Sequence, residues 1–304
     1  MTGRGFGLRF FLKGCPLRCR WCSNPEGISP ERELNISAVR CIGIEKCGRC
    51  LKACSQPQKR FALEQGFVKG VDRSCCDLCL KCVEFCPSGT IQIWGQMMTV
   101  SQVMDHILRD RSLYLKSGGG VTISGGECLL QLEFVLAILE ACRSQKIHTC
   151  VETSLHCHTA HVEAVLPLAD MIISDIKHMD SAKHKSATGV RNEQILSNLV
   201  RVTEFGLPLI LRVPIVPGYN DDEENIAATA AFIRDVLGNK ILQLQLLRFR
   251  KLGEEKYASL GMPYPMQDFA APERDVFEAG IREIADYFVS QGIPAIAGTT
   301  QKPK

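Results

Sequence analysis

The cysteines of this chain are too numerous and too unevenly spread to be ordinary core residues. The sequence holds 16 cysteines in 304 residues, and eleven of them fall in metal-ligand spacings before residue 87. In a chain of this length with no visible export signal, clustered cysteines indicate metal ligands rather than disulfides. A secreted, disulfide-bonded domain is the alternative, and the 45% hydrophobic content disfavours it. The chain is therefore predicted to fold around metal centres.

The first group stands in "KGCPLRCRWCSNPE", residues 13–26, and has the spacing C-x3-C-x2-C: Cys15, Cys19 and Cys22. Three thiolates are one short of a closed tetrahedral site, and catalytic metal sites keep such a position open. If these three bind a [4Fe–4S] cluster, one iron stays open to an exogenous ligand. A zinc knuckle with a distant fourth ligand is the alternative.

Two further groups contain four cysteines each. The second of them, "CDLCLKCVEFCP", has the spacing of bacterial ferredoxins, in which the fourth cysteine ligates the other cluster. Crossed ligation then predicts one [4Fe–4S] cluster on Cys41, Cys47, Cys50 and Cys86. It predicts another on Cys54, Cys76, Cys79 and Cys82. Cys75 breaks the register and is left out, and two structural zinc sites are the alternative.

Outside these groups, apolar strand-like runs alternate with helical patterns. The strands are expected at residues 8–13, 121–124, 148–153, 171–176, 209–216 and 242–249. Helices are expected at 129–145, 192–205 and 222–237. Such alternation predicts an α/β fold with a parallel sheet, here a partial (β/α)6 TIM-type barrel with its chemistry at the carboxyl ends of the strands. Residues 1–34 and 97–304 would form the barrel, and residues 35–96 an inserted ferredoxin-like iron–sulfur domain.

Charge and hydropathy exclude several classes of partner. The net charge is +3 with both signs mixed along the chain, which predicts no nucleic-acid partner. No apolar run approaches the roughly 20 residues that span a bilayer, and the first residues do not resemble a signal peptide. A cytoplasmic, monomeric protein is expected.

A glycine-rich turn follows the expected strand at 121–124. It reads Ser124, Gly125, Gly126, Glu127. Two glycines let the backbone approach a ligand closely, and a carboxylate can receive an ammonium group.

Together with the three-cysteine loop, this turn resembles the radical S-adenosylmethionine (SAM) superfamily. The segments "FLKGCPLRCRWCSNPE", "GGVTISGGE", "VETS", "DIKHMDSAKHKSATGV", "RVPIVPGYND" and "LGEEKYASLG" are similar to the glycyl-radical-enzyme activating enzymes. The similarity is to the subgroup with a two-cluster ferredoxin-like insert, such as activators of glycerol and diol dehydratases, choline lyase and arylacetate decarboxylases. It extends from about residue 3 to about residue 262.

The resemblance implies an activase. Such an enzyme reductively cleaves SAM to a 5′-deoxyadenosyl radical, which abstracts hydrogen from a glycine Cα of a partner glycyl radical enzyme. A flavodoxin- or ferredoxin-type protein would donate the electron, and the cells would be anaerobic. A radical SAM enzyme acting on a small molecule with auxiliary clusters is the alternative, and an electron-transfer protein is a third hypothesis.

The resemblance also implies roles for particular residues. The stretch Ser124–Glu127 would bind the SAM amino group, and Asp175 and Lys177 would hold SAM, with Lys177 neutralising its carboxylate. Arg212 would meet the SAM carboxylate or the partner backbone, with a salt bridge at the barrel rim as the alternative.

A monovalent cation near SAM is implied on Glu152, Thr153 and Asp175. His178 and His184 are expected to be solvent-exposed loop residues rather than ligands.

The sequence departs from the family pattern at three places. "GRGFGLR", residues 3–9, stands where another short strand is usual. Cys128 replaces a proline and is expected to be a small buried residue. Arg250 replaces a histidine that lies near SAM in relatives, and its side chain is expected to stack on adenine or reach a hydroxyl.

Overall fold

The computed structural model describes residues 7–299, which form two compact units. The sheet unit comprises residues 1–20, 98–250 and 269–304 of the chain. The cysteine-rich unit comprises residues 21–97 and 251–268, so it contains the predicted insert and further residues on both sides of it. The segment before Gly7, where the sequence departs most from the family pattern, lies outside the described residues.

A seven-stranded parallel sheet forms the centre of the sheet unit, in the order β1-β6-β7-β8-β9-β10-β11. Six of the strands were predicted: β1 Gly7–Leu12, β6 Gly120–Gly125, β7 His148–Glu152, β8 Met171–Asp175, β9 Leu209–Ile215 and β10 Gln243–Arg248. The prediction missed β11, Ala295–Ala297, because three residues are too short for a periodic pattern. The sheet has the α/β architecture that was predicted and is consistent with a partial barrel.

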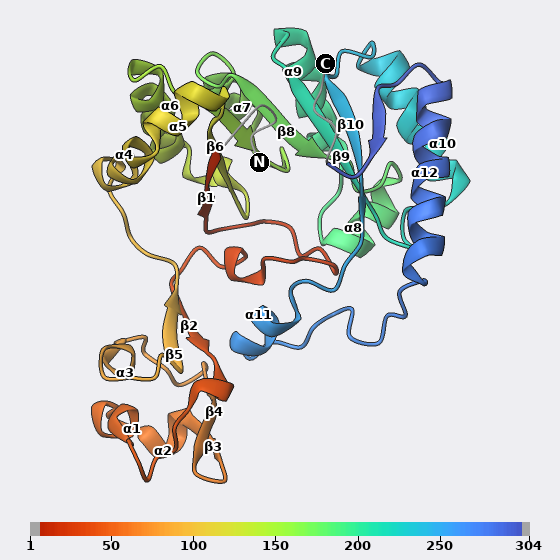
Figure 1. Ribbon diagram of the computed structural model, residues 1–304. Coiled ribbons are helices and arrows are strands. Elements are labelled where there is room, and N and C mark those ends of the chain that lie inside the picture. The colour runs from red at the N-terminus through yellow and green to blue at the C-terminus, as the bar shows by residue number, and fades with distance from the viewer. Residues whose placement is uncertain (1–6, 300–304) are drawn as a thin grey trace. The chain divides into compact units, whose positions relative to one another are not determined.

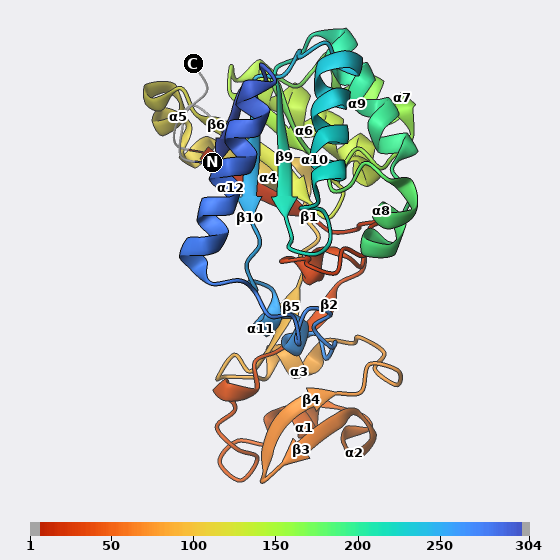
Figure 2. The same ribbon diagram turned by 90° about the vertical axis from the view of Figure 1, so that its right-hand side faces the viewer.

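Helices cover the sheet between successive strands (Figure 1). They are α4 Val100–Arg109, α5 Arg111–Ser117, η3 Cys128–Gln131, α6 Leu132–Ser144, α7 Thr159–Val165, α8 Ser181–Thr188, α9 Glu193–Phe205, α10 Glu223–Ala231, η4 Phe232–Val236 and α12 Arg274–Ser290. The helix predicted at 222–237 thus ends in a π-helical turn, η4. In the turned view α12 is drawn to the left of β9, and α10 and α9 to its right (Figure 2). Within residues 7–299, none of the helices has the length and apolar character to cross a bilayer.

The inner face of the sheet is apolar at its centre and polar at its carboxyl edge. Cys150, Met171, Ile173 and Ile210 form one buried cluster on neighbouring strands. Because side chains two residues apart share a face of a strand, the next inward positions are Glu152, Asp175 and Arg212. The edge at which a parallel sheet carries its chemistry therefore holds charged side chains above an apolar floor.

The cysteine-rich unit contains little regular structure. Its elements are η1 Pro25–Gly27, β2 Glu33–Ile36, η2 Ala38–Arg40, α1 Arg49–Ala53, α2 Pro57–Arg60, β3 Phe61–Glu64, β4 Phe67–Val71, α3 Lys81–Glu84, β5 Ile91–Trp94 and α11 Glu254–Ser259. β2 pairs with β5 and β3 with β4, both antiparallel. Its core is a small cluster of Leu34, Ile36, Cys50, Phe61, Val68 and Ile91.

Two glycines should respond oppositely to the same substitution. A Cβ on Gly120 would lie 2.0 Å from the His148 carbonyl oxygen, because β6 and β7 pair there, whereas a Cβ on Gly280 in α12 meets nothing within 4 Å. Gly120→Ala should destabilise the fold by roughly 1–3 kcal/mol. Gly280→Ala should stabilise it by about 0.5–1 kcal/mol, since alanine favours the helix. Thermal unfolding of the two full-length apo variants beside the parent chain measures this. Equal melting temperatures for the two would contradict the β6–β7 geometry.

Candidate active site

The three-cysteine loop is anchored to the glycine-rich turn at its start. The Gly126 N–H donates to the Leu12 carbonyl (2.9 Å), and the Glu127 N–H donates to the Gly14 carbonyl (2.6 Å). Gly125 has φ +144°, and a Cβ there would lie 2.1 Å from the Leu12 oxygen. Only glycine lets the turn lie this close to the end of β1.

The other end of the loop is fixed by α8. The Arg18 and Arg20 N–H groups donate to the carbonyls of Thr188 (2.6 Å) and Ala187 (3.0 Å). Cys15 and Cys19 therefore lie on backbone that is fixed at both ends of this segment. Cys22, three residues further on, belongs to the cysteine-rich unit.

The expectation for the two histidines was wrong. His178 is only 4% exposed and His184, within α8, only 2%. His184 Nδ1 lies 2.7 Å from the Val190 carbonyl and 3.1 Å from Thr188 Oγ1. The sequence pattern missed this because α8 is short and polar, and its three buried residues, His184, Ala187 and Thr188, give little hydrophobic periodicity. His184 stabilises the end of α8 that accepts the loop N–H groups.

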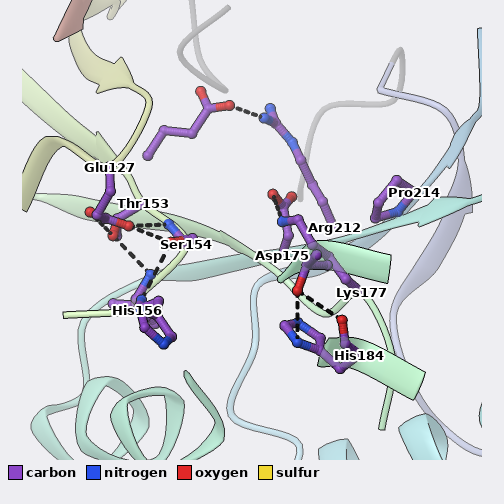
Figure 3. A network of polar contacts seen from close by, with 12 residues as sticks. Glu127, Thr153, Ser154, His156, Asp175, Lys177, His184, Arg212 and Pro214 are labelled. Atoms are coloured by element: carbon purple, nitrogen blue, oxygen red, sulfur yellow. Dashed lines mark hydrogen bonds and ion pairs between the residues drawn. The ribbon is translucent and has the colours of Figure 1, made fainter. Parts of the chain in front are cut away.

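Glu127 is fully buried, at 0% exposure, and both its carboxylate oxygens are engaged. One accepts the Leu129 N–H (3.0 Å) and the Thr153 hydroxyl (2.6 Å). The other accepts the N–H (2.8 Å) and the hydroxyl (2.5 Å) of Ser154. Figure 3 shows this group, which joins the glycine-rich turn to the end of β7. Gly125 and Gly126, in contrast, remain partly exposed.

Asp175 and Lys177 form an ion pair with 2.8 Å between Nζ and Oδ2 (Figure 3). Burial acts to lower the pKa of Lys177, but the Asp175 carboxylate and the Cys19 and Cys15 thiols outweigh it, so this pKa lies above its ordinary value. Lys177 is therefore a fixed positive charge beside two of the loop cysteines. Asn220 holds its backbone by donating to the Lys177 carbonyl (2.9 Å).

Arg212 makes the rim salt bridge that was the alternative for it. Its Nη1 lies 2.7 Å from Glu152 Oε1, and its Nε donates to Gln245 (3.1 Å). Arg9 lies 3.3 Å from the second oxygen of Glu152. A SAM-binding role for Arg212 stays a prediction.

The residues expected to hold a monovalent cation fit that ion poorly. Glu152 already faces two guanidinium groups, Asp175 faces Lys177, and the Thr153 hydroxyl donates to Glu127. A cation would have to compete with three positively charged side chains for these oxygens. No step of the reaction is assigned to such an ion.

Eight cysteines of the cysteine-rich unit border two separate hollows. The first is lined by Cys41, Cys47, Cys50 and Cys86. The second is lined by Cys54, Cys76, Cys79 and Cys82. Within residues 7–299 no group of three or more His, Cys, Asp or Glu side chains is close enough to hold a single metal ion. The thiols surround open space instead.

The free Cys82 thiol of the second hollow holds its proton. Burial, reinforced by the neighbouring Cys76 and Cys79 thiols, raises the pKa of Cys82 to about 11. Because a metal binds the thiolate, loading of this hollow must release protons.

Cys128, Cys75 and Arg250, the other unusual residues of the sequence, differ in burial and in their contacts. Cys128 is fully buried, as expected, and its thiol donates to the Glu152 carbonyl (3.5 Å). Cys75 contacts the carbonyls of Lys59 (3.4 Å) and Asp72 (3.6 Å) and lines neither hollow. Arg250 is exposed, and its contact with SAM stays a prediction.

Three residues of the site were not predicted: Ser154, Arg9 and Asn220. Ser154 completes the Glu127 shell, and Arg9 reaches Glu152 across β6. Asn220 joins Lys177 to Pro214 through its amide. Ser154 and Asn220 carried a signal, as the last residue of the family-like segment "VETS" and as a polar residue in the Pro-Gly-turn segment "PGYND".

Several known proteins are similar to this chain. A family model for the Radical SAM superfamily matches residues 80–230. A (2S)-3-sulfopropanediol dehydratase activating enzyme of Klebsiella oxytoca is 46% identical over 99% of this chain and 94% of its own. An isethionate sulfite-lyase activating enzyme of Nitratidesulfovibrio vulgaris is 39% identical over 93% and 92%. A 4-hydroxyphenylacetate decarboxylase activating enzyme of Clostridioides difficile is 35% identical over 97% and 92%.

A solved structure shares the fold. The crystal structure of Streptococcus suis SuiB bound to S-adenosylmethionine has a TM-score of 0.56 at 14% identity, covering 97% of this chain and about half, 51%, of that one. The three activating enzymes are 35–46% identical to this chain over nearly its whole length. The chain therefore belongs to the radical SAM superfamily and, within it, to the activating enzymes of glycyl radical enzymes.

Proposed function

We propose that the partner of this activase is a glycyl radical enzyme that breaks a C–O or C–S bond in a short sulfonated alcohol. The 46% identity to a (2S)-3-sulfopropanediol dehydratase activating enzyme carries the proposal, and the 39% identity to an isethionate sulfite-lyase activating enzyme supports it. The decarboxylase activator is less similar, at 35%. An activase binds the glycine segment of its partner enzyme and does not bind the partner's small substrate. Similar activases are therefore expected to recognise similar partner enzymes.

The sheet unit is proposed to bind SAM at the carboxyl edge of its strands. A [4Fe–4S] cluster on Cys15, Cys19 and Cys22 would use its open iron to hold SAM, which then supplies a 5′-deoxyadenosyl radical for hydrogen abstraction. The partly exposed backbone of Gly125 and Gly126 is suited to receive the SAM ammonium. Lys177 supplies a positive charge for its carboxylate.

The Glu127 carboxylate has a different proposed role from the one the family resemblance implies. Its oxygens already accept four hydrogen bonds, and the side chain is fully buried. It is proposed to fix the turn and the end of β7 so that the glycine backbone meets SAM in one geometry. Glu127 is then a positioning residue.

The cysteine-rich unit is proposed to hold two auxiliary [4Fe–4S] clusters that carry electrons. Two observations support this. Each hollow is lined by four cysteines, and the sets combine Cys86 with the first sequence group and Cys54 with the second. This is the crossed ligation of two-cluster ferredoxins.

Glu127→Gln tests the positioning role. Each carboxylate oxygen of Glu127 accepts a backbone N–H, one from Leu129 and the other from Ser154. In either orientation the glutamine NH2 replaces one of these acceptors, so one backbone N–H loses its partner. This should destabilise the protein by roughly 1–3 kcal/mol. The melting temperature of the apo protein should therefore fall before any SAM is added. Glu140→Gln, an exposed change on α6, should leave it unaltered. If Glu127→Gln keeps the apo melting temperature and weakens only SAM binding, Glu127 is a direct ligand instead.

Iron content tests the crossed ligation. Cys50→Ala combined with Cys86→Ala removes two ligands from one proposed cluster and none from the other. The double variant should lose about four of the roughly twelve irons that three [4Fe–4S] clusters carry. Cys75→Ala is the matched control and should keep all of them. Ligation within each sequence group would instead leave three cysteines at both sites, so two altered clusters in the Mössbauer spectrum would contradict the crossed arrangement.

Radical formation tests the partner. With SAM and a reductant, the enzyme should generate a glycine-centred EPR doublet on a sulfopropanediol- or isethionate-cleaving glycyl radical enzyme. We expect the rate to exceed that on an arylacetate decarboxylase by about tenfold or more, the range that a few altered contacts produce. A partner whose radical glycine is replaced by alanine gives the blank. Faster activation of the decarboxylase would overturn the proposed partner class and leave the activase assignment intact.

A further inference from the structure

A guanidinium group forms part of the wall of the second hollow. Arg60, the last residue of α2, is 6% exposed and lines this hollow together with Cys54, Cys76, Cys79 and Cys82. A buried arginine is costly unless its charge and its N–H groups find partners. The partners that Arg60 has, and the ones it lacks, therefore indicate what occupies the hollow.

Asp77 holds the guanidinium from one side only. Two parallel hydrogen bonds join them, Nη1 to Oδ1 at 2.9 Å and Nη2 to Oδ2 at 3.1 Å. The Asp77 side chain is 54% exposed and does not line the hollow. Water therefore screens the negative end of the pair, while the positive end faces the cysteines.

The hydrogen-bonding capacity of the Arg60 guanidinium is only partly satisfied. Its Nε is buried and has no hydrogen-bond partner. Its Nη1 lies 4.0 Å from Cys54 Sγ, the limit of a contact to sulfur. An anionic group with sulfur acceptors inside the hollow would complete the hydrogen bonding and oppose the charge.

The first hollow lacks such a charge. Among its described lining residues none carries a charged side chain. Its sulfurs receive backbone N–H groups instead, from Val68 to Cys41 (3.3 Å) and from Ile91 to Cys86 (3.4 Å). The two hollows thus differ by one buried positive charge.

We propose that Arg60 is a redox-tuning residue of the cluster held by Cys54, Cys76, Cys79 and Cys82. The inference rests on the proposed auxiliary clusters. Reduction adds one electron, taken from the flavodoxin- or ferredoxin-type donor, and makes the cluster and its thiolates more negative. A guanidinium at the wall stabilises that reduced form, as do N–H donors to its sulfurs, so the reduction potential is higher than with a neutral side chain.

An EPR-monitored redox titration of the reconstituted full-length protein tests the proposal. Arg60→Gln should lower the reduced-to-oxidised ratio of one auxiliary cluster at least about tenfold at fixed potential, which is 59 mV for one electron. Arg60→Lys should restore most of the shift. The control is Arg32→Gln, which should leave the potential unchanged, since Arg32 belongs to the same unit but is exposed and lines neither hollow.

Asp77→Asn should shift the potential in the opposite direction, and it also changes the oxygen that accepts the Cys79 N–H (3.2 Å). It leaves the guanidinium in place without its counter-charge, so the potential of the same cluster should rise. If Arg60→Gln fails to bind the cluster, the potential of the Asp77→Asn variant still tests whether the charge of Arg60 affects that cluster. Unchanged potentials in both Arg60→Gln and Asp77→Asn, with about twelve irons bound, would overturn the tuning role alone. A parent protein that binds only about four irons would overturn the auxiliary clusters themselves.

Discussion

The pairing of β1 with β6 is the constraint on which the candidate site depends. The two strands are separated by the whole cysteine-rich insertion, yet Leu12 pairs with Gly125 in register. That register places the loop of Cys15 and Cys19 against the glycine-rich turn. The entropy cost of closing a chain grows only slowly with its length, so a long segment between the strands is tolerated. A Cβ at Gly125 would collide with Leu12, so the register requires this glycine.

Charge at the carboxyl edge is distributed so that few groups remain free for a ligand. Glu152 faces Arg212 and Arg9, and Glu127 is closed within its hydrogen-bond shell. Buried carboxylates are stable only with such partners. The backbone of Gly125 and Gly126 stays partly exposed, whereas the ammonium of Lys177 is paired with Asp175.

Sequence reasoning succeeded where spacing along the chain determines structure. Cysteines two or three residues apart must lie together, and continuous apolar runs such as Met171–Asp175 make buried parallel strands. It failed where tertiary contacts decide. His184 is buried by the Thr188 and Val190 contacts at the end of α8, and Arg9 is ordered by a carboxylate from β7. The three residues of β11 show no period of their own and become a strand only by pairing with β10.

The two units differ in what stabilises them. The sheet unit has a continuous apolar layer and helices over its sheet, so its folding free energy comes from burial of apolar surface. The cysteine-rich unit has a small core, and one of its members, Cys50, also lines the first hollow. Much of its remaining packing is cysteine, including Cys41, Cys54, Cys82 and Cys86. A domain whose core atoms are themselves metal ligands gains its folding free energy from metal binding. The proposed clusters would therefore stabilise this unit, and their loss to oxygen would unfold it while the sheet unit stays folded.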